Sequence, residues 1–264
     1  MSSPDTARTA SRLIGVNVRS ADPERDQRVF SAITGTRPTH LGGSPVGGPD
    51  VSEFTLGDAF LRLTYHEPSD RTPTKGIERI IFGVGDLEAA VQQLALAKAA
   101  IEGRSDDAIV VDPTWAGMRV ELRQSAPPRE PRNPGPGAAV LDHVAVLVDD
   151  IDTMAVRWTA MLGSPPDTFG VHPLGTAVAA RFILGSRMIE LVAPLPDRDS
   201  PLRARLDRVG EGPYALAIIA TDLAATTEAV VASGARLLDQ PPHTVVHPSD
   251  ASGVPIQLTP RVHH

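Results

Sequence analysis

The chain has 264 residues, of which 41% are hydrophobic, and a formal net charge of −7 at pH 7. This length suits one large domain or two of ordinary size, and the acidic balance argues against nucleic acid or an anionic membrane surface as the main partner. Without cysteine, the chain forms no disulfide, thiolate metal site or cysteine nucleophile.

Two segments are predicted to lie outside the folded domains. Residues 1–11 resemble a disordered leader, because they lack the apolar core of a signal peptide. Residues 126–137, APPREPRNPGPG, hold five prolines and two glycines, which neither a helix nor a central strand tolerates. We therefore expect a linker between domains at 12–125 and 138–260. No apolar run approaches the roughly 18 residues of a membrane span, and we expect a cytoplasmic protein.

The two sides of this linker repeat each other. FTLGDAFLRL (54–63) matches FILGSRMIEL (182–191), and GIERIIFGVGDLEAA (76–90) matches GPYALAIIATDLAAT (212–226). Two further pairs keep the same order: GVNV (15–18) with HVAV (143–146), and GMRVEL (117–122) with GVPIQL (253–258). The offset grows from 182 − 54 = 128 to 212 − 76 = 136, and the extra residues fit an additional helix within 197–211.

The second half shows the predicted elements most clearly. Hydrophobic periodicity predicts a strand at 141–148 and a helix at 151–162. A hairpin follows at 177–184 and 188–192, turning at Gly185 and Ser186. The pattern then restarts with a strand at 214–220, a helix at 223–233 and a closing strand at 254–258. Each half is thus predicted to contain two βαβββ units.

These units, with LDHVAVLVDDID (141–152), MIELVAP (188–194) and HPSDASGVPIQL (247–258), resemble the vicinal oxygen chelate superfamily. It includes glyoxalases, bleomycin-resistance proteins, methylmalonyl-CoA epimerases and extradiol dioxygenases. The resemblance implies an α+β fold of two tandem domains. Each would be a pair of βαβββ units that form a cup-shaped mixed sheet with helices on the convex face.

The resemblance also implies a metal-binding position in each cup. In the second half the matching residues are His143, Glu190, Ala215 and Gln257, so alanine replaces the usual histidine and glutamine the usual glutamate. His143, Glu190 and Gln257 could still hold one divalent ion (Zn, Ni, Co, Mn or Fe) with open positions. In the first half the matching residues are Gly15, Arg62, Arg79 and Glu121, and the two cations argue against a metal there.

Strand alternation supports the second-half candidates independently. Side chains alternate between the two faces of a strand, and each of the four residues lies on the less apolar face. That face is the one expected to line the cup. His143 could equally be a core histidine bonded to a neighbouring carbonyl. Without a metal, His143 and Glu190 could act as a catalytic acid–base pair, because an adjacent carboxylate orients an imidazole.

The remaining candidates are predicted to bind substrate. Gln257, Ala215 and His247 would line the second cup, although the His-Pro pair at 247–248 also suits a turn, and His172 is similar. Arg62, Arg79 and Glu121 could form either an internal ion pair or an anion pocket.

The leading hypothesis is a small-molecule enzyme of the proton-transfer type, an epimerase, isomerase or lyase, that acts on an oxygen-rich or carbonyl metabolite in the second cup. One alternative is a metal-free protein that binds and sequesters a small molecule or antibiotic. Another is an extradiol-type dioxygenase. A homodimer is a further possibility.

Overall fold

The structure, a computed structural model, describes residues 12–42, 50–65, 75–125, 139–172, 175–196, 200–240 and 243–260. The predicted leader at 1–11 and linker at 126–137 lie outside these described residues.

The first half begins with β1 (Arg12–Ser20), α1 (Pro23–Thr34), β2 (Thr39–His40), β3 (Asp50–Leu56) and β4 (Ala59–Tyr65). It continues with β5 (Gly76–Val84), α2 (Leu87–Leu96), β6 (Ile101–Arg104), β7 (Ala108–Val111), α3 (Pro113–Ala116) and β8 (Val120–Gln124). The pattern of a strand, a helix and several strands thus occurs twice.

The second half begins with β9 (Val140–Leu147), α4 (Ile151–Leu162), β10 (Thr168–Val171), β11 (Ala177–Leu184), β12 (Arg187–Pro194) and α5 (Pro201–Val209). It continues with β13 (Gly212–Ala220), α6 (Leu223–Ala232), β14 (Leu237–Gln240), β15 (His243–Val246), the 3-10 turn η1 (Pro248–Asp250) and β16 (Ile256–Pro260). Helix α5 is the additional helix expected within 197–211.

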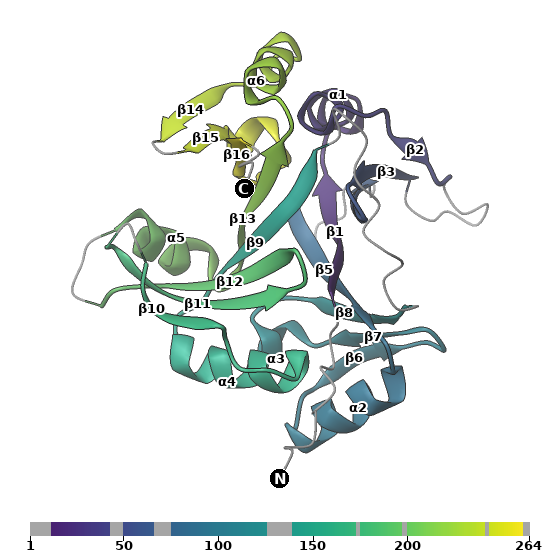
Figure 1. The fold of residues 1–264 in the computed structure, drawn as a ribbon, viewed down its shortest axis with the longest axis vertical. Coiled ribbons are helices and arrows are strands. Elements are labelled where there is room, and N and C mark those ends of the chain that lie inside the picture. Colours follow the sequence, from purple (N-terminus) through teal and green to yellow (C-terminus); the bar gives the residue numbers. More distant parts are fainter. Residues whose placement is uncertain are drawn as a thin grey trace. The chain divides into compact units, whose positions relative to one another are not determined.

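Two eight-stranded mixed sheets contain these strands (Figure 1). Their orders are β2-β3-β4-β1-β5-β8-β7-β6 and β10-β11-β12-β9-β13-β16-β15-β14, so each strand of the first sheet has a counterpart in the second. Strands β1 and β4 pair in parallel, as do β13 and β16. The α+β fold of tandem domains built from βαβββ units is therefore confirmed, and both sheets are open.

An aspartate begins the main helix of every βαβββ unit. Its carboxylate accepts a hydrogen bond from the backbone N–H three residues later, which satisfies a donor that the first helical turn leaves unpaired. The pKa of Asp150 is lowered by the hydrogen bonds from Thr153. The four capping residues are Asp22, Asp86, Asp150 and Asp222.

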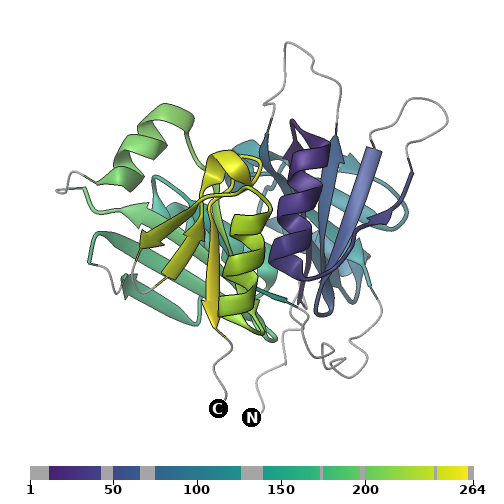
Figure 2. The same cartoon turned by 90° about the horizontal axis from the view of Figure 1, so that it is seen from above.

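The chain forms two compact units, each of which takes residues from both halves. Unit 1 comprises 1–13, 81–128 and 144–213, and unit 2 comprises 14–80, 129–143 and 214–264. In unit 1, the fully buried Trp158 of α4 donates from Nε1 to the carbonyl of Ala116 at 3.0 Å and meets the Phe82 ring edge-on. In unit 2, α1 and α6 lie side by side (Figures 1 and 2).

Candidate functional site

Glu190 lies on β12 directly opposite Arg181 of β11. Arg181 donates from Nε to Oε1 of Glu190 at 2.7 Å. The Glu190 side chain is 8% exposed and that of Arg181 is 29% exposed. The carboxylate is therefore buried with its own counter-charge, as the cost of burying a lone charge requires.

His172 is the third member of this group, which we call the Arg181 cluster (Arg181, Glu190 and His172). Its Nε2 is 3.8 Å from Oε1 of Glu190, and its backbone N–H donates to the carbonyl of Ala177 at 2.8 Å. Helix α4 packs against β11 and β12. The other face of these two strands carries fully or almost fully buried apolar side chains: Phe182, Ile189 and Leu191. The cluster thus lies on the face of the hairpin opposite these apolar side chains.

His143 is positioned by a carboxylate rather than by a backbone carbonyl. Its Nδ1 is 2.8 Å from Oδ2 of Asp142, and its side chain is 16% exposed. This contact orients the ring and is the arrangement that orders many catalytic and metal-bound imidazoles. His143 belongs to unit 2 and Glu190 to unit 1, and the acid–base pair proposed for them stays a prediction.

Ala215 and Gln257 share one face of the sheet. Gln257 of β16 pairs with Ala217 of β13, two residues after Ala215 and therefore on the same side. Val245 of β15 flanks Gln257 on the other strand. Ala215 is 2% exposed, and its methyl group supplies no donor atom. The structure thus brings together these two of the four predicted positions.

The donor set does not fit a divalent metal ion. Glu190 already accepts from the Arg181 guanidinium, whose positive charge would repel a cation bound to the same carboxylate. Ala215 removes the second histidine, and Gln257 is neutral. Within the described ranges, no three or more histidine, aspartate or glutamate residues are grouped so that they could hold a metal ion.

Arg62 and Glu121, two of the three first-half candidates, each form an ion pair with a residue that was not predicted. Arg62 of β4 donates from Nε to Oε2 of Glu53 on β3 at 2.7 Å, and its guanidinium carbon lies 4.2 Å from the centroid of the Phe60 ring. Glu121 of β8 is buried and pairs with Arg123, while Arg79 lies on β5.

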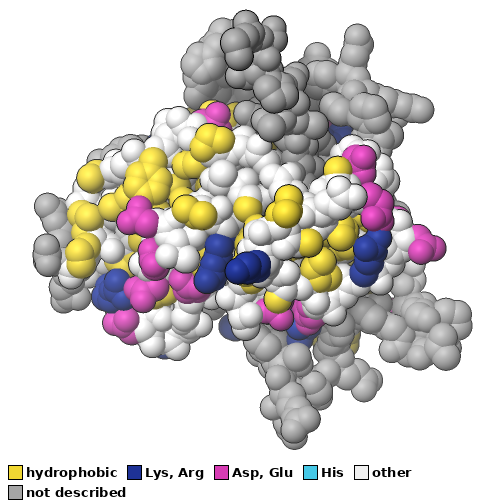
Figure 3. Space-filling model, turned by 90° about the horizontal axis from the view of Figure 1, so that it is seen from below, with side chains coloured by type: hydrophobic (Ala, Val, Ile, Leu, Met, Phe, Trp, Pro, Cys, Tyr) yellow, Lys and Arg dark blue, Asp and Glu magenta, His cyan; other side chains and the backbone are white. Residues whose placement is uncertain are grey.

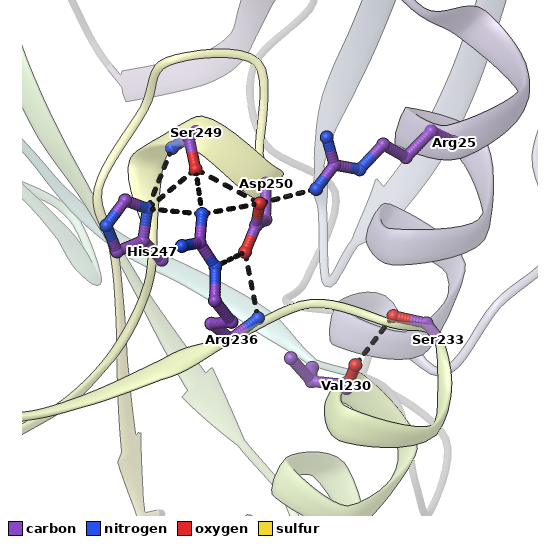
Figure 4. Close-up of polar contacts among 7 residues, drawn as sticks. All are labelled: Arg25, Val230, Ser233, Arg236, His247, Ser249 and Asp250. Carbon is purple, nitrogen blue, oxygen red and sulfur yellow. Dashed lines mark hydrogen bonds and ion pairs between the residues drawn. The ribbon is translucent and has the colours of Figure 1, made fainter.

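His247 caps the η1 turn, the role that the His-Pro pair also suited (Figure 4). Its Nδ1 accepts from the backbone N–H of Ser249 at 3.2 Å. Beside it, the buried carboxylate of Asp250 accepts a hydrogen bond from Nε of Arg236 at 2.8 Å and also forms an ion pair with Arg25 of α1. The hydrogen bond from Arg236 is the largest cause of a strongly lowered Asp250 pKa. This group joins α1 to the last βαβββ unit.

Charges are mixed on the face shown in Figure 3, where basic side chains are interspersed with acidic ones. Every helix in the described part of the chain is too short or too polar to cross a membrane.

A family comparison matches most of the second half. A family model described as a glyoxalase-like domain matches residues 141–258. This matched region is similar to a glyoxalase-like domain, and we call it the glyoxalase-like domain below. The resemblance to the vicinal oxygen chelate superfamily is thereby confirmed. No curated protein matches the sequence.

Some solved structures match nearly the whole chain and share its fold, and others match about half of it. A triple mutant of 4-hydroxymandelate synthase from Streptomyces coelicolor is 17% identical, with a TM-score of 0.76 over 97% of this chain and 94% of that one. A xylose isomerase-like TIM barrel/4-hydroxyphenylpyruvate dioxygenase fusion protein is 12% identical, with a TM-score of 0.69 over 99% of this chain and 51% of that one. Methylmalonyl-CoA epimerase from Mycobacterium tuberculosis is 28% identical, with a TM-score of 0.41 over 47% of this chain and 88% of that one.

Arg181 of the glyoxalase-like domain was not predicted, although the sequence contains a signal for it. The predicted hairpin turns at Gly185 and Ser186, so residues equally far from the turn must face each other. The observed pairs Leu184–Arg187 and Arg181–Glu190 follow this rule. The position of a turn thus identifies the partner of a charged strand residue from the sequence alone.

Proposed function

We propose that the glyoxalase-like domain binds a small oxygen-rich metabolite at the Arg181 cluster without a divalent metal. The 2.7 Å contact between Arg181 Nε and Glu190 Oε1 carries this proposal. It neutralises the carboxylate that a metal would need, and it fixes a guanidinium on the same face of β11 and β12. Metal-free binding of a small molecule is one of the alternatives that the sequence leaves open.

The chemistry of Arg181 indicates the ligand class. Glu190 engages Nε, and the terminal nitrogens of Arg181 make no hydrogen bond to the described residues. A guanidinium edge of this kind binds the two oxygens of a carboxylate, phosphate or enediolate in a bidentate manner. Because the Arg181 side chain is 29% exposed, a solute can reach it. We therefore favour an anionic or carbonyl-containing ligand.

Ligand titration tests the proposal. Calorimetry with malonate, glycolate and inorganic phosphate should detect binding to the full chain that EDTA does not change. Arg181→Lys should weaken this binding about tenfold, because lysine keeps the positive charge but cannot donate two parallel hydrogen bonds as a guanidinium does. Arg119→Lys is the matched control, since Arg119 pairs with Glu102 at an exposed site. Binding that EDTA abolishes, or that Arg181→Lys leaves unchanged, would contradict the proposal.

Proton transfer is the second candidate function, and two carboxylate–imidazole contacts favour it. His172 lies 3.8 Å from Glu190, and His143 lies 2.8 Å from Asp142. His172 could exchange a proton next to a carbonyl that Arg181 polarises, and His143 could act as a base on a ligand within its own unit. The names of the structural neighbours span oxygenation and epimerisation, so the shared fold does not determine the reaction.

Isotope exchange separates binding from catalysis. In deuterium oxide, proton NMR should show loss of the signal next to the carboxylates of malonate if the chain catalyses exchange. His172→Gln and His143→Gln, each measured against wild type, would then identify the base. Binding without exchange above the protein-free rate would leave sequestration as the function.

A further inference from the structure

Arg62 of the first half is held in place on two sides. Glu53 accepts from Nε at 2.7 Å, and the Phe60 ring supports the guanidinium at 4.2 Å. All three side chains lie on the same face, because Glu53 is the direct strand partner of Arg62 and Phe60 precedes it by two residues. A guanidinium fixed in this way loses little conformational entropy when it binds a ligand.

Gly15 makes room for this support. It is the strand partner of Phe60, and a Cβ atom built on it would lie 2.3 Å from a carbon of the Phe60 ring. Any other residue at position 15 would displace the ring. The position that a metal ligand occupies in the resemblance is therefore used here to seat the aromatic ring beneath Arg62.

Asn17 adds an unsatisfied acceptor on the same face of the sheet as Arg62. It is the strand partner of Arg62 on β1. Its Oδ1 is buried and has no hydrogen-bond partner among the described residues. A buried acceptor without a partner costs stability, so the arrangement favours a donor from a ligand.

We propose that Arg62 and Asn17 form a second ligand site, which binds a small carboxylate that carries a hydroxyl donor. Glu53 engages Nε, and the terminal nitrogens of Arg62 make no hydrogen bond to the described residues, so that edge can take both carboxylate oxygens. The ligand hydroxyl donates to Oδ1 of Asn17. The Arg62 and Glu53 side chains are 23% and 27% exposed, which leaves the guanidinium accessible to small solutes, and the Asn17 side chain rotates to bring its buried Oδ1 to the ligand hydroxyl.

This site is distinct from the Arg181 cluster, and its test is independent of the proposed function. The probes are glycolate, which has the hydroxyl group, and acetate, which lacks it. The readout is the Nε–H resonance of Arg62 in labelled full-length protein, assigned by its disappearance in Arg62→Lys. We expect glycolate to shift this resonance in wild type and equally in Arg181→Lys.

Asn17→Ala keeps the Arg62–Glu53 pair and removes only the acceptor. It should weaken glycolate binding about fivefold, the effect of one neutral hydrogen bond, and leave acetate binding unchanged. An Arg62 resonance that neither acid shifts would overturn the site. Equal affinities for glycolate and acetate in wild type would overturn the role of Asn17. Loss of the Arg62 shift in Arg181→Lys would show that one site, not two, is present.

Discussion

The same place on the sheet carries an ion pair in both halves, with the charges exchanged. In the first half Arg62 of β4 faces Glu53 of β3, and in the second half Glu190 of β12 faces Arg181 of β11. The Nε–Oε distance is 2.7 Å in both pairs. The repeated hairpin therefore fixes which residues face each other, while the sequence decides which strand carries the cation.

The two pairs differ in burial, and this difference separates their chemistry. The Glu190 side chain is 8% exposed, whereas those of Arg62 and Glu53 are 23% and 27% exposed. A carboxylate buried against an arginine depends on that arginine for its stability. A carboxylate that water reaches depends less on its arginine, because water can solvate its charge. The second half thus holds a structural ion pair with one accessible cation, and the first half holds a pre-oriented arginine.

Removal of Arg181 should have the largest effect on stability. Arg181→Ala leaves the Glu190 carboxylate buried without its counter-charge, which should lower the free energy of unfolding by about 3 kcal/mol. Urea unfolding followed by circular dichroism measures this change. In a Glu190→Gln background, which carries no buried charge, the same substitution should cost less than half as much. Equal costs in both backgrounds would show that the pair is not coupled.

Asp250 provides a buried carboxylate outside the two hairpins. Its folded-state pKa lies below the unfolded value, so its contribution to stability is complete above about pH 4 and is lost as the pH falls below that value. Asp250→Asn should cost about 2 kcal/mol at pH 7 and flatten the acid side of the stability profile. Urea titrations from neutral to acidic pH measure both effects, with Asp107→Asn in an exposed loop as the control. A variant with an unchanged acid profile would refute this assignment.

Much of the fold was predictable from the sequence because the two halves repeat each other. Helix α4 spans the predicted residues, as does β11. The strand beginning at 188 in the prediction begins at Arg187. Residues close in sequence determine these elements, through hydrophobic period, aspartate caps and glycine turns.

The candidate site was less predictable because side-chain partners depend on strand register. Strand phase placed Glu190 on the face opposite the most apolar one, but its partner Arg181 follows only when the turn position is used as well. Similarly, Gly15 by itself indicates only a position without a metal-ligating side chain. The hydrophobic pattern does not reveal that the Phe60 ring occupies the space that a side chain at position 15 would fill. Such a steric relation between β1 and β4 involves long-range packing that periodicity does not encode.

Gly15 is the first-half equivalent of His143, and Gly15→Ala tests whether the Phe60 ring requires a residue without a side chain at this position. The added Cβ would lie 2.3 Å from the Phe60 ring, and displacement of the ring should cost about 1.5 kcal/mol. Phe60→Met copies the methionine at the equivalent position of the second half and should recover most of this loss in the double variant. Urea unfolding measures all three proteins. No recovery in the double variant would mean that contacts other than Phe60 exclude the methyl group.

Arg62→Ala should have the smallest effect, although its pair has the same geometry as that of Arg181. Water reaches both partners, so Glu53 can be hydrated once Arg62 is gone, and we expect a loss of about 1 kcal/mol. A double-mutant cycle with Glu53→Ala isolates the pair from the stacking of Arg62 on Phe60. Arg119→Ala is the control, because the Arg119–Glu102 pair is still more exposed, at 37% and 38%. A loss as large as that of Arg181→Ala would show that burial does not separate the two halves, because the first-half pair would then support its sheet as strongly as the second.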